Sequence, residues 1–240
     1  MAKRIRMFAG PNGSGKSTIF TNVRRQFYSG VFVNADQIER TLRLQGFVNL
    51  HNYNIIASTR SLDDFITSFG LAERLSAQNK QISLSLVDNV VTVKDADIHS
   101  YTASILAAFI RMNLLATSQT FSFETVMSHA SKVDFLQRAK AQQFKTYLYY
   151  VCTDSPDSNV ARVNQRVAKG GHPVPEDKIV SRYYRSLELL KSAVNATNRS
   201  YIFDNSGSDY RLVLEVANGN DITIHDPNIP SWITRHFLNK

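Results

Sequence analysis

The sequence predicts an α/β fold in which a parallel sheet is flanked by helices and carries a mainly helical insertion. Near the N-terminus, an apolar run at 5–8 precedes a glycine-rich loop, a helical pattern and a second strand pattern. After residue 119, three more strand patterns alternate with helical ones. The 240 residues are 43% hydrophobic and 20% charged, which is ordinary globular composition and excludes a disordered chain.

The first elements follow from local patterns. Residues 17–28 have a helical pattern, and the β-branched and aromatic run at 31–33 is typical of a strand. Residues 41–119 have apolar residues at helical spacing and contain no proline. Within them, residues 82–86 alternate apolar and polar side chains, as a strand or hairpin does. We therefore expect one domain over 1–240, with 41–119 as a mainly helical insertion or substrate-side subdomain.

The second part of the chain continues the alternation of strands and helices. A Gly-Gly-His-Pro sequence at 170–173 interrupts it, because glycine and proline end helices. The predicted elements are a strand at 120–125, a helix at 131–143, a strand at 146–151, a helix at 159–168, a helix from Pro175 to about Val194, a strand at 200–205, short strands around 218–220 and an amphipathic piece at 232–238.

The net charge of +8 indicates a polyanionic partner. Residues 1–25 contain six Lys or Arg and no acid, and residues 160–191 contain seven against three acids. Residues 41–119 contain six of each and are neutral. The excess therefore lies around the glycine-rich loop and 160–191, which favours nucleotide phosphates over nucleic acid. The basic residues that could still form a surface patch are Lys3, Arg4, Arg6, Arg24 and Arg25.

Cysteine usage and hydropathy exclude several classes of protein. Cys152 is the single cysteine, so an internal disulfide framework and a cysteine-based zinc site are excluded. No run of 18 apolar residues is present, and the N-terminus lacks the apolar region of a signal peptide. We therefore expect a cytoplasmic protein that does not span a membrane.

The glycine-rich loop matches G-x-x-x-x-G-K-[ST] from Gly10 to Ser17, between a predicted strand and a predicted helix. Its glycines let backbone N–H groups converge on phosphate oxygens, and the helix N-terminus favours negative charge. Lys16 can reach the β- and γ-phosphates, and the Ser17 hydroxyl can ligate Mg²⁺. The predicted phosphate-binding residues are Gly10, Pro11, Asn12, Gly13, Ser14, Gly15, Lys16, Ser17 and Thr18.

Two acidic residues follow predicted strands. Asp36 comes after the strand at 31–33 and can act as a base toward a substrate hydroxyl, although on its own it fits a helix N-cap slightly better. Glu124 ends the strand at 120–125, where packing explains a charge poorly. It can hold Mg²⁺ or a substrate hydroxyl, and the alternative is again a cap.

Arginines recur at helical spacing in the segment 157–191. Arg162 and Arg166 share one helical face, and Arg182 lies on the next helix with Arg185. A mobile helical flap that carries arginine over transferring phosphates is a recurrent device in phosphoryl transfer. The alternative is a solvated basic face.

Several segments together resemble the zeta-toxin family of P-loop kinases, in its stand-alone bacterial branch, predicted ABC-type ATPases. The likeness covers about 1–40 and 120–206. The Gly-Gly-His-Pro-Val-Pro-Glu-Asp sequence with its flanking arginines is more particular than the phosphate loop. The matching segments are 9–18, 34–36, 122–125, 161–172, 182–187 and 204–206.

The resemblance implies a kinase-like P-loop NTPase fold and ATP-dependent phosphorylation of a small hydroxylated substrate, such as a UDP-activated N-acetyl amino sugar. An antitoxin protein is a possible partner. The resemblance places Lys16 and Ser17 at ATP·Mg²⁺, and it makes Asp36 the general base. The other residues implied are Glu124 and Thr125 for the substrate or metal side, and Arg162, Arg166 and Arg182 for the phosphates.

Two other functions stay open at this point. One is an ATP-dependent nucleic-acid-binding or end-processing protein, which the basic charge motivates. The other is an ATP-binding regulatory module with weak turnover, whose partner surface would be the segment 41–119.

Overall fold

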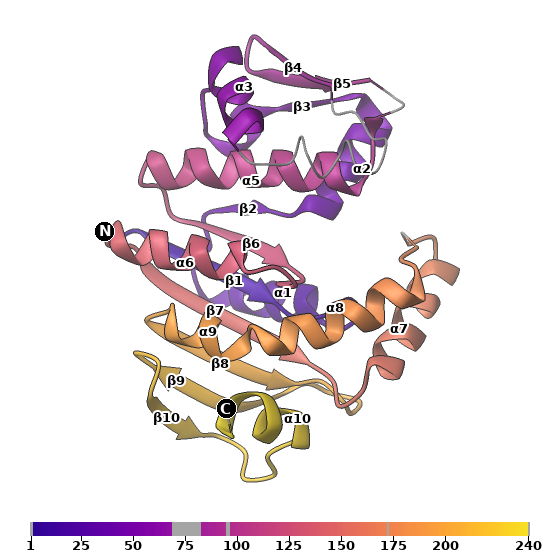
Figure 1. The fold of residues 1–240 in the computed structure, drawn as a ribbon, viewed down its shortest axis with the longest axis vertical. Helices are drawn as coiled ribbons and strands as arrows, with labels where there is room; N and C mark the ends of the chain where they lie inside the picture. Colours follow the sequence, from indigo (N-terminus) through magenta and orange to yellow (C-terminus); the bar gives the residue numbers. More distant parts are fainter. Residues whose placement is uncertain (1, 69–82, 95–96, 172, 240) are drawn as a thin grey trace. The chain divides into compact units, whose positions relative to one another are not determined.

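The computed structural model describes residues 2–68, 83–94, 97–171 and 173–239 (Figure 1). The chain divides into two compact units. The first unit is Met1–Ser29 with Ser122–Lys240, and the second is Gly30–Phe121. Each unit is described separately.

A mixed sheet forms the centre of the first unit, with the order β10-β9-β8-β7-β1-β6. β1 pairs in parallel with β7, and β7 pairs in parallel with β8, as the sequence predicts. β9 and β10 extend the sheet in antiparallel pairing. The strands are β1 (Arg4–Ala9), β6 (Phe121–Thr125), β7 (Lys145–Cys152), β8 (Arg199–Asp204), β9 (Arg211–Ala217) and β10 (Asp221–Ile224).

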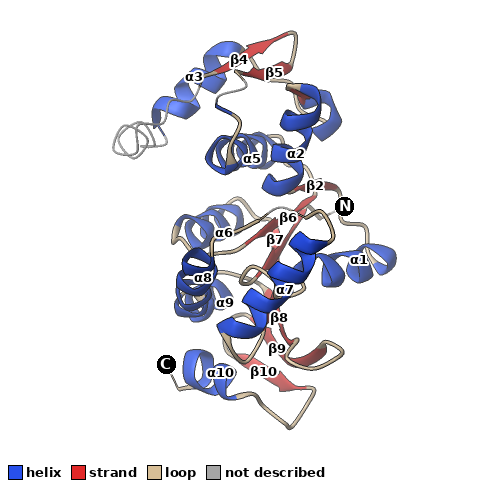
Figure 2. Ribbon diagram, turned by 90° about the vertical axis from the view of Figure 1, so that its right-hand side faces the viewer, coloured by secondary structure: helices blue, strands red, loops and turns tan. Residues whose placement is uncertain are grey.

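Helices lie on both sides of this sheet (Figure 2). α6, α8 and α9 lie on one side and α1 lies on the other. Between them, the parallel strands β1 and β7 are buried along most of their length, because both of their faces are covered. The helices are α1 (Lys16–Gln26), α6 (Ser131–Ala141), α7 (Pro156–Ala168), α8 (Glu176–Glu188), α9 (Leu190–Asn195) and α10 (Ser231–Ile233), with a π-helical turn η3 (Thr234–Leu238).

The helix predicted from Pro175 to about Val194 is two helices, α8 and α9, which are separated at Leu189. α8 buries Ile179, Tyr183 and Leu187. The break lets α9 bury a separate set of apolar residues. Continuous apolar spacing concealed the break, since no glycine or proline marks it.

The second unit combines helices with a small antiparallel sheet of order β3-β5-β4. The strand or hairpin predicted at 82–86 is the hairpin β4–β5, although residue 82 lies outside the described residues. Asp88 and Asn89 form its turn at φ +49° and +63°, which these residue types tolerate. The elements are β2 (Val31–Val33), α2 (Ala35–Gln45), β3 (Phe47–Asn49), η1 (Leu50–Tyr53), α3 (Thr59–Ser68), β4 (Leu84–Val87), β5 (Val90–Val93) and α5 (Ser100–Ala116).

α5 supplies much of the core of the second unit. It is apolar on nearly all sides, and 11 of its 17 residues are buried. Arg111 lies among them, and burial lowers its pKa to about 10. Within the described ranges no helix, α5 included, has the length and apolarity needed to cross a membrane.

The reactivity of the buried Cys152 thiol provides a test of how β7 is packed. Its side chain is 0% exposed, and burial raises the pKa of its thiol to about 12. Because only the thiolate reacts, we expect almost no labelling by a thiol reagent at pH 8 in the folded protein. In denaturant, one equivalent per chain should react, since Cys152 is the only cysteine. Fast labelling of the folded protein would contradict this packing.

Candidate functional site

The phosphate loop approaches neighbouring backbone so closely that side chains are excluded. Gly10 has φ +141° and Gly13 has φ +77°, conformations that favour glycine. A Cβ on Gly10 would collide with the carbonyl oxygen of Val151, and one on Gly13 would lie 2.6 Å from that of Asn159. The loop is therefore seated directly on the end of β7 and on α7.

Side chains from two distant segments hold the loop in this conformation. Asn159 on α7 donates from Nδ2 to the carbonyl of Asn12. Asn205, which follows β8, donates from Nδ2 to the carbonyl of Ser14 at 2.8 Å. Lys16 donates from Nζ to the carbonyl of Pro11 at 2.8 Å, so it lies over the loop.

The loop also contains buried polar atoms that the protein does not satisfy. The Ser14 hydroxyl and Asn12 Oδ1 are buried and have no hydrogen-bond partner. No side chain caps the N-terminus of α1, and its first turn holds no acid. A phosphate fits the Ser14 hydroxyl and the helix N-terminus, because it would accept hydrogen bonds from both, whereas Asn12 Oδ1 is itself an acceptor.

Glu124, which the sequence indicated as a candidate ligand of Mg²⁺ or of a substrate hydroxyl, lies beside the phosphate loop. The Ser17 hydroxyl donates to its Oε2 at 3.0 Å, across 107 positions of sequence. Lys16 Nζ lies 3.9 Å from its Oε1. The side chains of Lys16 and Glu124 are only 7% and 13% exposed. A hydroxyl and a carboxylate side by side are oxygen ligands of the kind that Mg²⁺ prefers.

Thr125 follows Glu124 and stabilises the end of β6. Its hydroxyl oxygen accepts from the backbone N–H of Met127 at 3.1 Å. Met127 has φ +55°, so the hydrogen bond supports a tight change of direction. The predicted contact of Thr125 with a substrate stays a prediction.

Asp36 lies in the second unit, in the first turn of α2. The cap of α2 is Asn34, whose Oδ1 accepts from the backbone N–H groups of Asp36 at 2.8 Å and Gln37 at 3.2 Å. The alternative reading of Asp36 as the N-cap is therefore wrong. Its side chain is exposed, and its role as a base stays a prediction.

The predicted arginines lie on the pair of packed helices α7 and α8. Arg162 Nη2 donates to the carbonyl of Gly207 at 3.3 Å, so it lies beside the loop that follows β8. Arg166 is exposed on α7, and Arg182 is half-buried on α8. The Gly-Gly-His-Pro segment at 170–173, which the sequence predicts to separate the two helices, includes His172, which lies outside the described residues.

A buried carboxylate that sequence reasoning left without a role fixes the segment after β8. Asp204, only 4% exposed, accepts from Ser206 Oγ at 2.6 Å and from Trp232 Nε1 at 3.1 Å. It also accepts from Arg211 Nε at 3.2 Å. Ser206 Oγ in turn accepts from the backbone N–H of Asp154 at 2.9 Å. Of these residues, only Asp204 and Ser206 belong to a segment, 204–206, that carries the family resemblance.

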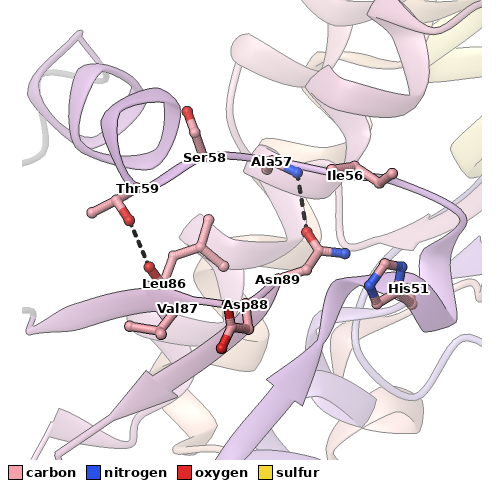
Figure 3. A pocket seen from close by; sticks show the side chains of 9 residues that line it. All are labelled: His51, Ile56, Ala57, Ser58, Thr59, Leu86, Val87, Asp88 and Asn89. Atoms are coloured by element: carbon pink, nitrogen blue, oxygen red, sulfur yellow. Dashed lines mark hydrogen bonds between the residues drawn. The ribbon is translucent and has the colours of Figure 1, made fainter.

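The second unit has a hollow of its own, with a volume of about 580 Å³ (Figure 3). The Asn89 side chain braces it, since its Oδ1 accepts from the backbone N–H of Ala57 at 3.0 Å. None of the predicted site residues lines it. The lining residues are His51, Ile56, Ala57, Ser58, Thr59, Leu86, Val87, Asp88 and Asn89.

Three solved structures share this fold. A chain of the AvrRxo1-ORF1:AvrRxo1-ORF2 complex with sulphate ions aligns at a TM-score of 0.59 and 13% identity, covering 94% of this chain and 62% of that chain. A chain of the AvrRxo1-ORF1:-ORF2 complex with ATP aligns at a TM-score of 0.58 and 13% identity, covering 93% of this chain and 61% of that chain. A chain from the PezAT chromosomal toxin–antitoxin system of Streptococcus pneumoniae aligns at a TM-score of 0.54 and 13% identity, covering 99% of this chain and 80% of that chain.

These structures define the class of the fold. It is a P-loop kinase-like α/β fold with the phosphate loop after the first strand. More particularly, it is the fold shared with the matched chains of the AvrRxo1 complexes and of the PezAT toxin–antitoxin system. The chain spans less than two thirds of the length of the AvrRxo1 chains that it matches.

Sequence comparison adds little to the structural likeness. No family model matches the chain. An uncharacterized protein of Haemophilus influenzae is 33% identical over 63 residues, which are 26% of this chain and 45% of that protein. The fold assignment therefore depends on the structure.

The packing of the phosphate loop predicts unequal effects of two matched substitutions. Gly13 has φ +77° and Gly170 has φ +84°, but only Gly13 has backbone within 4 Å of an added Cβ. Alanine at either position costs about 1–2 kcal/mol of stability for the left-handed backbone. Gly13→Ala should cost about 1–3 kcal/mol more, because of the clash with Asn159. Urea unfolding measures both, and equal losses would refute the close contact.

Proposed function

We propose that this protein is an ATP-dependent kinase that transfers the γ-phosphate of ATP to a hydroxyl group of a small substrate. The observation that carries the proposal is the meeting of Lys16, Ser17 and Glu124 at the phosphate loop. A loop that only stabilised the fold would not need a lysine, a hydroxyl and a carboxylate together. The presence of ATP in one of the AvrRxo1 complexes also supports it.

The chain's own residues supply most of the electrostatic part of such a reaction. The loop amides and Lys16 would hold the phosphates and neutralise charge that grows in the transition state. Ser17 and Glu124 would hold Mg²⁺, which when bound would offset the negative charge of the phosphates. Because Ser17 and Glu124 already share a hydrogen bond, these two oxygen donors are prearranged.

Asp36 would accept the proton of the attacking substrate hydroxyl, as a carboxylate does in kinases. Its exposure agrees with a residue that meets a substrate from solvent. The acceptor we propose is a UDP-activated N-acetyl amino sugar, on the strength of the zeta-toxin resemblance. Thr125 would contact this substrate at the end of β6, with Glu124 as an alternative substrate ligand.

Arginines of the α7–α8 pair would act on the transferred phosphoryl group. The contact of Arg162 with the loop after β8, which also holds the phosphate loop, supports this role. Arg166 and Arg182 would join it when the helices close over ATP. Planar guanidinium groups suit phosphate oxygens because they donate two parallel hydrogen bonds.

An antitoxin protein is a further proposed partner. The PezAT chain comes from a toxin–antitoxin system, and the AvrRxo1 chain comes from a complex of two proteins. Co-expression with the product of a neighbouring gene, followed by purification of the complex, would test this point.

Lys16→Ala should lower phosphoryl transfer at least about 100-fold, because it removes a charge aimed at the phosphates. Transfer is measured with radiolabelled ATP, Mg²⁺ and a panel of nucleotide sugars, and mass spectrometry identifies the product. Lys140→Ala, an exposed lysine on α6, is the matched control and should retain activity. Full activity of Lys16→Ala would remove the phosphate loop from the mechanism.

Asp36→Asn should keep ATP affinity and lower transfer by about 10²- to 10⁴-fold, the usual contribution of a general base. Isothermal titration with ATP separates binding from chemistry. Asp63→Asn, which changes another exposed carboxylate of the second unit, controls for charge alone. If Asp36→Asn transfers phosphate at the normal rate, another residue is the base.

A further inference from the structure

One face of the first unit carries tyrosines and cations that the phosphate site does not use. It is the face of the sheet that packs against α1, since the ring of Phe8 in β1 lies 5.2 Å from that of Phe20 in α1. We call it the tyrosine face and define it by Arg6, Lys145, Tyr147, Arg199 and Tyr201. In register, Arg6 is opposite Tyr147, Tyr147 is opposite Arg199, and Tyr149 is opposite Tyr201.

The aromatic rings on this face form a ladder across three strands. Phe8 and Tyr149 stack at 4.8 Å between centroids and 14° between planes. Tyr149 and Tyr201 continue the stack at 5.0 Å and 19°. Phe8 and Tyr149 are buried, whereas Tyr201, the last ring, is half-buried. The strand beyond it places Glu215 opposite Tyr201, so no further ring of the sheet extends the ladder.

Cations lie beside the rings, and two of them are accessible, whereas Arg6 is only 6% exposed. Lys145 is exposed, and the Arg199 side chain is 49% exposed. The Arg6 guanidinium lies 5.4 Å from the centre of the Tyr147 ring. A hydrogen bond with Tyr201 raises the pKa of Arg199, which therefore stays charged.

The C-terminal end of α1 extends the same surface. Arg6 Nη1 donates to the carbonyl of Tyr28 at 2.8 Å, which places Tyr28 next to the tyrosine face. The Tyr28 side chain is 79% exposed, and that of Phe27 is 53% exposed. Arg24 and Arg25 are exposed in the last turn of the helix. Two exposed aromatic side chains next to two arginines are poorly explained by folding.

We propose that the tyrosine face binds single-stranded RNA, with a base stacked on Tyr201 at the end of the ladder and phosphates at Lys145 and Arg199. Stacking platforms bordered by cations are the usual means of binding unpaired strands, and an open sheet with aromatic residues is a common form. The first 29 residues and β7 add cations without an acid, so the charge is complementary to phosphates.

The preference for RNA over DNA comes from Glu215. Its carboxylate lies opposite Tyr201 and is 22% exposed. Arg199 Nη1 lies 3.0 Å from its Oε1 and His225 Nε2 lies 3.4 Å from its Oε2, and each carboxylate oxygen keeps a further acceptor position. A ribose 2′-hydroxyl next to the stacked base can donate to it, and deoxyribose cannot. This surface is separate from the phosphate loop and does not depend on kinase activity.

Fluorescence anisotropy with a labelled oligouridylate of about 12 nucleotides tests the proposal, since unpaired strands of this length fill such sites. We expect binding that weakens as salt rises. Tyr201→Leu should weaken it at least about fivefold, the lower end of a stacking contribution. Lys145→Ala changes an exposed side chain that folding does not need, and it should weaken binding and lessen the salt dependence.

Three controls make the result decisive. Arg60→Ala removes an exposed charge of the second unit and should leave RNA affinity unchanged. Lys16→Ala should also retain RNA binding, because it changes only the phosphate loop. The proposal is overturned if no binding occurs at low salt, if the deoxy oligonucleotide binds equally, or if Lys16→Ala abolishes binding.

Discussion

The direct contact of the phosphate loop with its neighbours is the constraint on which the site depends. Gly10 and Gly13 lie against backbone carbonyls of Val151 and Asn159, with no room for a side chain. This contact joins the end of β1 to the end of β7 and the start of α7. The loop conformation is therefore set by the sheet and not by the loop alone. Asn205, which lies far from the loop in sequence, also holds it by a hydrogen bond to the carbonyl of Ser14.

Parallel strand order explains why distant residues meet at this place. β1, β7 and β8 run in the same direction, so their carboxyl ends share one edge of the sheet. The phosphate loop, Asp154 and Asn205 follow these ends, and Glu124 lies at the end of β6. The buried Asp204 fixes the last of these segments through Trp232 and Arg211. The C-terminal part of the chain thereby supports the phosphate site.

The positive charge of the chain serves two separate surfaces in this interpretation. Lys16 is buried over the loop, where it faces the phosphates and Glu124. The cations of the tyrosine face lie at the other ends of the same strands, beside aromatic rings. The sequence favoured nucleotide phosphates over nucleic acid as the partner of this charge. Tyr150 does pack within the core, but neighbouring positions of β7 alternate, so Tyr147 faces the other way.

The sequence by itself determined the α/β class, the phosphate loop and most strands, because these depend on local patterns of apolar, β-branched and glycine residues. It could also nominate Glu124, since a charge after an apolar strand is conspicuous. Only the tertiary structure decided that Glu124 meets Lys16 and Ser17, that Asn34 and not Asp36 caps α2, and that Asn159 holds the loop. The contacts of Glu124 and Asn159 join residues that are far apart in sequence. The cap of α2 is a choice between two nearby residues that are both suited to cap a helix. Such contacts depend on the order of the strands and on the backbone geometry of the loops. The local periodicity of a sequence predicts neither the strand order nor the loop geometry.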